Sequence, residues 1–363
     1  MNNTLTIIGA ILTIVGLTIT FLIPKEYQKG VTLVTIIIAV LSAIVYFSLT
    51  YFYILLAILL VVSITLNFVF YRKQIFMKRL VSFFKEKEQK KEYAEIIRWG
   101  SALSKALWLS HNFKTRKEIG QYVEKSAPKL SHSKALIRAK INDIGWTSVE
   151  LLDYDNAERI IKEGIILAEQ ENDFYMMAKG YRYLFSIYLR QGNQLVIAEE
   201  YLNNSLAETQ KMADGNPQKT ELIAEYHFAK ASLENKKGNH KLALKEIEKA
   251  ENEYKQLPDK EWAIKIKARK GDITLASKEA GYIDTAITIF NNGLEESRKY
   301  QYLRQTVKNL TGLGACYIAK GKDHYTDAKT NLSEAKKIAE KLSLYYELGV
   351  IDKHISNLNN KQL

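Results

Sequence analysis

The sequence repeats a helical pattern at a nearly constant interval over most of its length. Five alanines, spaced 41 to 45 residues apart, each stand four residues before a large apolar residue: Ala157 before Ile161, Ala198 before Leu202, Ala243 before Ile247, Ala286 before Phe290, and Ala328 before Leu332. From about residue 93 the apolar residues follow the period of an α-helix rather than the alternation of a strand. Because the chain has only four prolines, long helices meet few obstacles. The pattern predicts a stack of helical hairpins, none of which buries its apolar face alone.

Within each hairpin, the two helices are joined by turns such as Gly238-Asn239 and Gly281-Tyr282-Ile283-Asp284, with small residues and Tyr late in the first helix. These features, over about residues 93–345, resemble tetratricopeptide (TPR) repeats. The standard TPR period is about 34 residues, so each hairpin here is longer by about two helical turns in total. Longer TPRs are familiar from kinesin light chains, peptide-sensing regulators of Gram-positive bacteria and sensor ends of large signalling ATPases. The resemblance implies an all-α fold with a right-handed TPR α-solenoid of five to six hairpins.

The two ends of the repeat region depart from the regular pattern. A degenerate first copy is expected at residues 93–128, with Trp99, Trp108, Phe113 and Ile119 in its core. Residues 346–363 are expected to form a terminal capping helix and a polar tail. Small residues such as Gly145 and Gly314 are expected to let paired helices approach closely.

The N-terminal part of the chain has a different composition. Leu5–Ile23 is a 19-residue apolar run, and Gly30–Tyr71 contains 42 residues without Asp, Glu, Lys or Arg. One membrane-spanning helix needs about 20 residues, so the longer stretch should fold back on itself. We expect a transmembrane domain at residues 1–71, a bundle of three helices at about 5–23, 31–48 and 51–70. A signal peptide is less favoured, because no Lys or Arg precedes the first run.

A basic segment at 72–92 follows. Residues 72–91 carry eight Lys or Arg and two Glu, which places the N-terminus outside and the repeats in the cytoplasm of a multi-pass cell-membrane protein. Its apolar residues have roughly helical spacing, which favours an amphipathic juxtamembrane helix on anionic lipid of the inner leaflet. A stop-transfer flank continuing into the next helix is the alternative, and the two do not exclude each other. The membrane-surface residues would be Arg72, Lys73, Lys78, Arg79 and Lys85.

The net charge of +12 suggests a nucleic-acid binder only when the chain is taken as a whole. Half of this excess lies in residues 72–91, and only +5 remains for the 272 residues that follow. We therefore expect no nucleic-acid partner. A single cysteine excludes an internal disulfide framework and a cysteine-based zinc cluster.

No sequence motif predicts catalysis, a cofactor or a metal site. Phosphate-binding loops and H-E-x-x-H are absent, and the six histidines have no ligand spacing. Gly312-x-Gly314 lacks a third glycine and lies within a predicted helix, so it indicates helix packing. Cys316 is expected to be a small buried residue rather than a nucleophile. We expect a protein that is not an enzyme.

The resemblance to TPR proteins implies a concave surface, formed by the first helix of each hairpin, that holds an extended peptide or a partner helix. The residues expected there are Asn142, Trp146, Arg182, Ser186, Phe228, Asn235, Lys236 and Lys308. Asn side chains can bind a peptide backbone, and Arg and Lys favour an acidic segment or a C-terminal carboxylate. A pair matching the carboxylate clamp of some TPRs is missing from the first repeat.

Three functions remain open from the sequence. The favoured one is a membrane-anchored cytoplasmic TPR scaffold for protein–protein interaction. The alternative is a peptide- or signal-responsive TPR sensor or regulator at the membrane. A membrane enzyme fits worst, because the three expected spans contain no charged side chain.

Overall fold

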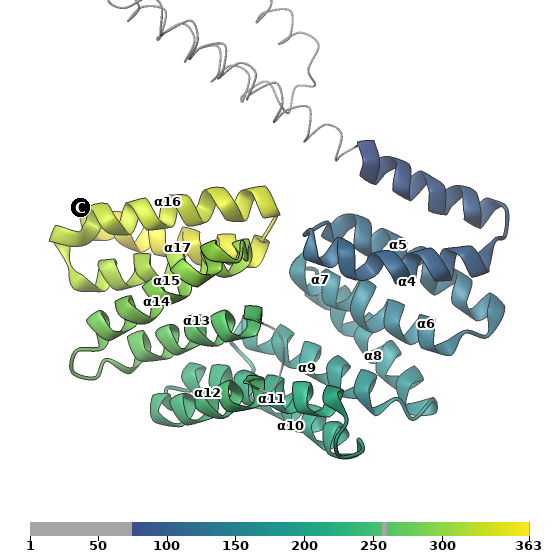
Figure 1. The fold of residues 1–363 in the computed structure, drawn as a ribbon, viewed down its shortest axis with the longest axis horizontal. Coiled ribbons are helices and arrows are strands. Elements are labelled where there is room, and N and C mark those ends of the chain that lie inside the picture. Colours follow the sequence, from purple (N-terminus) through teal and green to yellow (C-terminus); the bar gives the residue numbers. More distant parts are fainter. Residues whose placement is uncertain (1–74, 256–259, 363) are drawn as a thin grey trace, which may run out of the picture. The chain divides into compact units, whose positions relative to one another are not determined.

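The computed structural model describes residues 75–255 and 260–362, whose helices are arranged as in Figure 1. The chain divides into two compact units, residues 1–79 and 80–363. The first unit is described only at residues 75–79, which belong to a helix that continues to residue 89. All regular secondary structure in the described residues is helical, which confirms the all-α prediction for this part of the chain.

The predicted membrane localisation needs correction. Among the helices of residues 75–255 and 260–362, none combines the length and the apolar character that a membrane span requires. The physical reason is that every labelled helix of 18 residues or more contains at least three charged side chains. A multi-pass cell-membrane protein with cytoplasmic repeats is therefore not supported. The three spans expected at about 5–23, 31–48 and 51–70 lie outside the described residues.

The lipid contacts expected beside the membrane depend on that localisation and are not supported either. Lys78, Arg79 and Lys85 are exposed on the helix of residues 75–89. Arg72 and Lys73 lie outside the described residues. The structure therefore offers no argument for a lipid partner at this segment.

In the second unit, consecutive helices pack as hairpins, and each hairpin packs on the next. The first three pairs are α4 (Tyr93–Leu109) with α5 (Phe113–Ser126); α6 (Ser133–Arg138), η4 (Ala139–Trp146) and α7 (Thr147–Glu150) with α8 (Tyr154–Gln170); and α9 (Phe174–Gln191) with α10 (Leu195–Gln210). The next three are α11 (Pro217–Lys236) with α12 (His240–Tyr254), α13 (Lys260–Ser277) with α14 (Tyr282–Lys299), and α15 (Leu303–Lys320) with α16 (Tyr325–Leu342). Helix α17 (Tyr345–Gln362) packs on the last pair, and η3 (Ala127–Leu130) and η5 (Lys322–His324) are short connections.

The five repeated alanines and the large residues that follow them lie where the sequence pattern predicts. All ten side chains are fully buried: Ala157, Ala198, Ala243, Ala286, Ala328, Ile161, Leu202, Ile247, Phe290 and Leu332. The alanine lets two helices approach, and the large residue one turn later fills the space between hairpins. This local packing explains why the hairpins recur at a nearly constant interval.

Glycine extends the same packing where even a methyl group does not fit. A Cβ atom on Gly145 would lie 2.5 Å from the Ile161 side chain, and one on Gly314 would lie 2.6 Å from Leu332. Neither glycine has a positive φ, so the backbone conformation does not require glycine at either position. Their role is therefore close helix approach, as the sequence predicts.

The first hairpin differs in part from the prediction. Phe113 and Ile119 are buried as expected, and Trp108 is half-buried against Phe113, with ring centroids 5.2 Å apart. Trp99 is not in the core, because its side chain is 41 % exposed and donates a hydrogen bond to Glu95. Helix α4 instead buries the face that carries Ile96.

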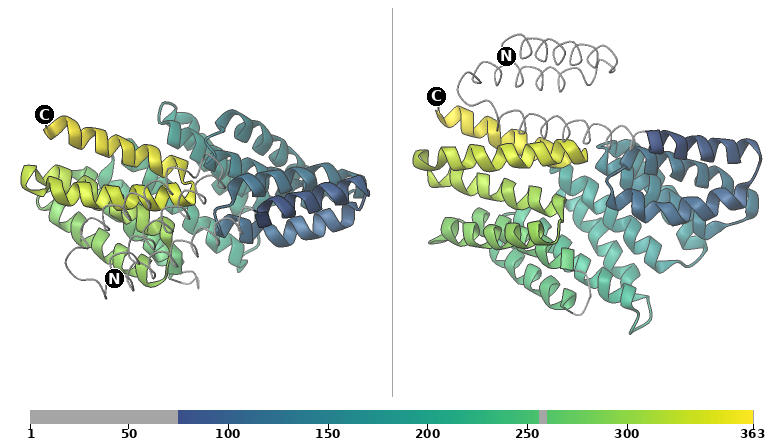
Figure 2. Two further views of the ribbon diagram at one scale, coloured as in Figure 1. Left: turned by 90° about the horizontal axis from the view of Figure 1, so that it is seen from above. Right: turned by 45° about the horizontal axis from the view of Figure 1, so that its top comes forward.

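The first and last hairpins of the second unit contact each other. Phe113 of α5 belongs to the same buried apolar cluster as Leu344 and Ile351 near the C-terminus, and Trp108 and Leu151 pack against that cluster. In Figure 2 the yellow C-terminal helices meet the blue N-terminal ones in both views. The array of hairpins therefore returns to its own beginning.

Candidate partner-binding surface

Charged and aromatic side chains from the first helices of successive hairpins interact with one another across the array. We call this set the inner cluster: Trp146 of η4, Glu150 of α7, Lys179, Arg182, Tyr183 and Arg190 of α9, Glu225 and Phe228 of α11, Trp262, Lys265 and Arg269 of α13, Arg304 and Lys308 of α15, and Tyr346 and Glu347 of α17. Cations outnumber carboxylates in it.

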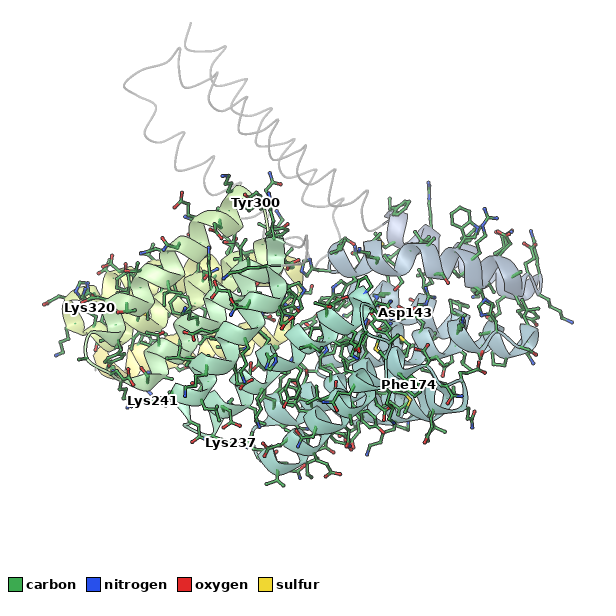
Figure 3. All side chains as sticks on the ribbon, turned by 60° about the horizontal axis from the view of Figure 1, so that its bottom comes forward. Asp143, Phe174, Lys237, Lys241, Tyr300 and Lys320 are labelled. Carbon is green, nitrogen blue, oxygen red and sulfur yellow. The ribbon has the colours of Figure 1, made fainter. Side chains whose placement is uncertain are left out.

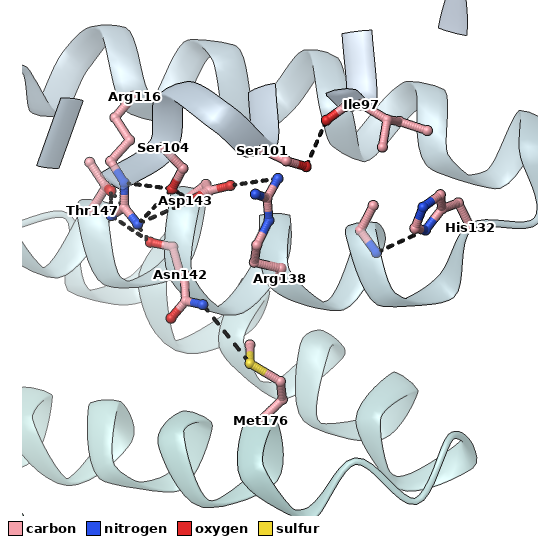
Figure 4. Close-up of polar contacts among 11 residues, drawn as sticks. Ile97, Ser101, Ser104, Arg116, His132, Arg138, Asn142, Asp143, Thr147 and Met176 are labelled. Atoms are coloured by element: carbon pink, nitrogen blue, oxygen red, sulfur yellow. Dashed lines mark hydrogen bonds and ion pairs between the residues drawn. The ribbon is translucent and has the colours of Figure 1, made fainter. Parts of the chain in front are cut away.

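One end of the inner cluster is an aromatic stack on the π-helix η4. The rings of Trp146 and Tyr183 are stacked with centroids 4.5 Å apart, and the Tyr183 hydroxyl donates to Asn142 Oδ1 at 3.0 Å. The Asn142 amide points toward Met176, with Nδ2 3.9 Å from the sulfur (Figure 4). Trp146 and Asn142 thus contribute one aromatic ring and one amide group, both from η4.

A buried polar network holds the π-helix in place. Arg116 of α5 forms an ion pair with Asp143 at 3.0 Å, and its other nitrogen donates to the Asn142 carbonyl and to Thr147 Oγ1 (Figure 4). Ser104 also donates to Asp143. Arg116 therefore binds both a side chain and a backbone carbonyl of η4 and attaches this segment to α5.

Arg182 lies next to the aromatic stack and is paired. Its guanidinium is 2.5 Å from Glu225 of α11 and 4.7 Å from the centroid of the Tyr183 ring. Burial alone would lower the pKa of Arg182, but Glu225 and the surrounding tyrosines together outweigh it, and the pKa is raised. The charge of Arg182 is therefore balanced within the protein.

Two lysines of the inner cluster have no carboxylate partner among the described residues. Lys265 Nζ lies 3.4 Å from the centroid of the Trp262 ring and 4.9 Å from that of Phe228. Burial, and then the charge of Lys308, hold the pKa of Lys265 well below its usual range. Burial and the charge of Arg304 lower the pKa of Lys308 to about 8. Neither lysine forms an ion pair with a carboxylate of the described residues, and burial disfavours the charged form of both.

A network of four charged side chains links the ends of the array beside Lys308. Glu150 accepts from Arg190 at 2.7 Å and from Arg304 at 2.6 Å, and Arg304 also binds Glu347 at 2.8 Å. Burial alone would raise the pKa of Glu150, but Arg304 and Arg190 outweigh it and hold the pKa below its usual range. The carboxylate of Glu150 therefore stays charged and binds both arginines.

The structure brings together most of the residues predicted from the sequence. Asn142, Trp146, Arg182, Phe228 and Lys308 lie in or next to the inner cluster, and Ser186, one turn after Arg182, donates to the Arg182 carbonyl at 3.0 Å. Asn235 and Lys236 are not brought there. They lie at the end of α11, where Asn235 contacts His240 at 2.9 Å and Lys236 is exposed.

The neighbours of those two residues mark the outside of the array. Lys237 and Lys241, which follow them in the chain, lie at the edge of the second unit in Figure 3. Lys237 binds Glu199 at 2.7 Å there. The end of α11 is thus a turn region and not part of the inner cluster.

Sequence reasoning missed several members of the inner cluster. Lys265 and Arg269 are four residues apart on α13, and Arg304 and Lys308 are four residues apart on α15. Residues at this spacing lie on one face of a helix, so the two pairs are a signal that the sequence contains. The two pairs indicate a shared surface only once the structure shows which helices face each other.

The described residues provide few groups suited to metal binding or nucleophilic catalysis. No group of three His, Cys, Asp or Glu side chains in residues 75–255 and 260–362 is placed to hold a metal ion. Cys316 is fully buried, and burial raises the pKa of its thiol to about 12. A thiol with this pKa is a poor nucleophile at neutral pH.

The fold defines the described part of the chain as an all-α helical-repeat protein. A solved structure supports this class: the chain is similar to the apo form of RapI, with a TM-score of 0.55, at 14% sequence identity, over 72% of this chain and 92% of that chain. No family model and no curated protein matches the sequence. At this identity the likeness concerns the fold.

Proposed function

We propose that the protein is a helical-repeat scaffold that binds a protein or peptide partner on its inner cluster and has no catalysis of its own. The observation that carries this proposal is the pair of half-buried lysines, Lys265 and Lys308, without a carboxylate partner in the described residues. Uncompensated charge lowers stability, and a binding surface is where such a cost is retained. The excess of cations favours an acidic partner segment.

The aromatic residues support a partner that is a polypeptide. Trp146, Tyr183, Trp262 and Phe228 are distributed over η4, α9, α11 and α13, so they extend along the array. Aromatic side chains and arginines contribute most of the binding free energy at protein interfaces. An extended segment can contact rings and cations on several hairpins at once.

Photo-crosslinking in cells tests the proposal with the full chain. A benzoylphenylalanine placed at Ser186 of α9 is expected to crosslink a specific protein or peptide. The matched control is Val196 of α10, which is 81 % exposed on the second helix of the same hairpin. Equal crosslinking at both positions, or none at Ser186, would contradict binding on the inner cluster.

A signal-responsive sensor is the second candidate function. It is favoured by the ion pair between Arg304 and Glu150, which joins distant hairpins immediately beside Lys308. A ligand that attracts Arg304 competes with Glu150 and so changes the contact between the ends of the array. Fluorescence energy transfer between labels on α5 and α16 tests this candidate. The transfer efficiency should change when the partner identified by crosslinking is added, whereas a passive scaffold would show no change.

A further inference from the structure

The last helix of the array places two side chains in the inner cluster. Helix α17 packs on α15 and α16, and its first turn carries Tyr346 and Glu347. The centroid of the Tyr346 ring lies 4.6 Å from the guanidinium carbon of Arg190 on α9. Glu347 Oε1 accepts a hydrogen bond from Arg304 Nε on α15 at 2.8 Å. The C-terminal helix of the chain therefore contacts two cations of the surface that is proposed to bind the partner.

Arg190 is enclosed by groups from three other elements. Besides Tyr346, the Trp146 ring of η4 lies with its centroid 5.4 Å from the guanidinium carbon, and Glu150 of α7 accepts from the guanidinium at 2.7 Å. Since the Arg190 side chain is only 13 % exposed, a partner reaches its guanidinium only when one of these groups moves. The segments η4 and α7 pack between α5 and α8, whereas α17 packs mainly on the two helices of one hairpin. Tyr346 therefore belongs to the element that is held least.

The attachment of α17 combines few buried side chains with unfavourable features. Within residues 345–361 only Glu347, Ile351 and Leu358 are buried. Glu347 Oε2 is buried without a hydrogen-bond partner among the described residues, which costs free energy. The turn between α16 and α17 contains Ser343 at φ 55°, a left-handed conformation that is costly for a residue with a Cβ. These costs favour local opening of the first turn of α17 without unfolding of the array.

We infer that the first turn of α17 is an autoinhibitory contact, in which Tyr346 and Glu347 cover Arg190 and Arg304 until a partner displaces them. Such a contact lowers the apparent affinity for the partner in proportion to the fraction of molecules in which the contact is open. A partner that binds only the open form shifts the population toward it. This inference rests on the proposed function and adds how the inner cluster is regulated.

Hydrogen exchange of the free full chain tests whether the contact opens. The amides of residues 348–351 depend on the first turn of α17, as shown by the bond from the Leu348 amide to the Leu344 carbonyl at 2.9 Å. We expect them to exchange at least about tenfold faster than the amides of residues 332–339 in α16, which lie in the same apolar cluster. Glu347→Gln should accelerate exchange at residues 348–351 further and leave α16 unchanged. Equal exchange in the two segments would show that α17 leaves only on global unfolding, and would overturn the inference.

Photo-crosslinking from Ser186, one helical turn before Arg190, tests whether opening favours the partner. With benzoylphenylalanine at this position of the full chain, the yield of the crosslinked product in cells should rise about threefold or more in Tyr346→Ala and in Glu347→Gln. Tyr346→Phe keeps the ring beside Arg190 and should retain the wild-type yield. Circular dichroism should show that all variants are folded.

Asp352→Asn is the matched control, because Asp352 is a carboxylate of the same helix that binds Lys336 of α16 at 2.8 Å on the exposed surface. It should change neither the exchange at residues 348–351 nor the crosslinking yield. A folded Tyr346→Ala variant that crosslinks no better than the wild type, or an equal rise in Asp352→Asn, would overturn the autoinhibitory contact and leave the proposed function in place. Absence of crosslinking at Ser186 in every variant would contradict the proposed function itself.

Discussion

Arg304 of α15 and Glu150 of α7 are 154 residues apart in the sequence, and their side chains form an ion pair of 2.6 Å. Both side chains are largely buried, and the pair links the sixth hairpin of the described array to the second. This polar link and the apolar cluster that contains Phe113 of the first hairpin together join the two ends of the array.

Replacing Glu150 by Gln should therefore destabilise the protein strongly. The change leaves Arg304 and Arg190 partly buried without their shared carboxylate, at a cost of about 3 kcal/mol in the free energy of unfolding. Urea denaturation measures this loss. Arg298→Ala is the control, because Arg298 binds Glu334 at 2.7 Å on the exposed surface and should cost less than about 1 kcal/mol. Equal losses in the two variants would contradict the role of the buried network.

Lys308→Met should make the free protein more stable at pH 7. The pKa of Lys308 is lowered to about 8 in the folded state, whereas the ordinary value is 10.5. The folded state therefore disfavours the charged lysine, and removing the charge should stabilise by about 1–3 kcal/mol. Because the unfolded chain binds more protons between about pH 8 and pH 10.5, the stability of the wild type rises over this range. The difference between the two proteins, measured by urea denaturation, should shrink accordingly, and a constant difference would refute this explanation.

His111 should make the protein less stable in mild acid. It lies near Arg304, Glu150, Glu261 and Glu347, and burial, followed by the charge of Arg304, lowers its pKa below 6.5. A histidine that stays neutral in the folded state contributes stability above pH 6.5, and this contribution is lost as the pH falls below that value. His111→Asn removes the titration and keeps a residue that tolerates the left-handed backbone at φ 56°. Melting temperatures from pH 7.5 to pH 5 should fall less steeply in this variant than in the wild type.

Gly312→Ala should disrupt helix packing, although alanine favours helices. The added methyl group would lie 2.3 Å from the Phe290 ring, which is fully buried, and such overpacking costs about 1–3 kcal/mol. Gly349→Ala in α17 is the control, because apart from its own helix backbone and chain neighbours nothing lies within 4 Å of its added Cβ. This second change should raise stability by about 0.5–1 kcal/mol. The melting temperatures of both variants measure the two effects. A higher melting temperature in both would show that Phe290 can move away from the added methyl group.

The hairpins could be predicted from the sequence because their packing is local. Ala157 and Ile161, or Ala286 and Phe290, contact residues of the same or the adjacent hairpin, so each repeat carries its own packing pattern. The prediction that Trp99 lies in the core is wrong, and its exposure shows that a large apolar residue does not define the buried face of a helix.

The candidate site was only partly predictable, because it depends on distant contacts. Arg182, Phe228 and Lys308 could be assigned from their positions on first helices. Glu150 and Arg304 could not be paired from the sequence, since their contact depends on the path of all the hairpins between them. Asn235 lies on a first helix too, but at its end, where small errors in helix boundaries move a residue from the inner cluster to a turn.

The contact between the two ends of the array also restricts how this chain can evolve. An open solenoid gains or loses a repeat by duplication or deletion, because each repeat contacts only its neighbours. Here Phe113 packs with residues near the C-terminus and Glu150 binds Arg304, so an inserted or deleted hairpin would move both partners out of reach. The number of repeats is thereby fixed by the structure, and relatives with the same closure should vary in their turns rather than in their count of hairpins.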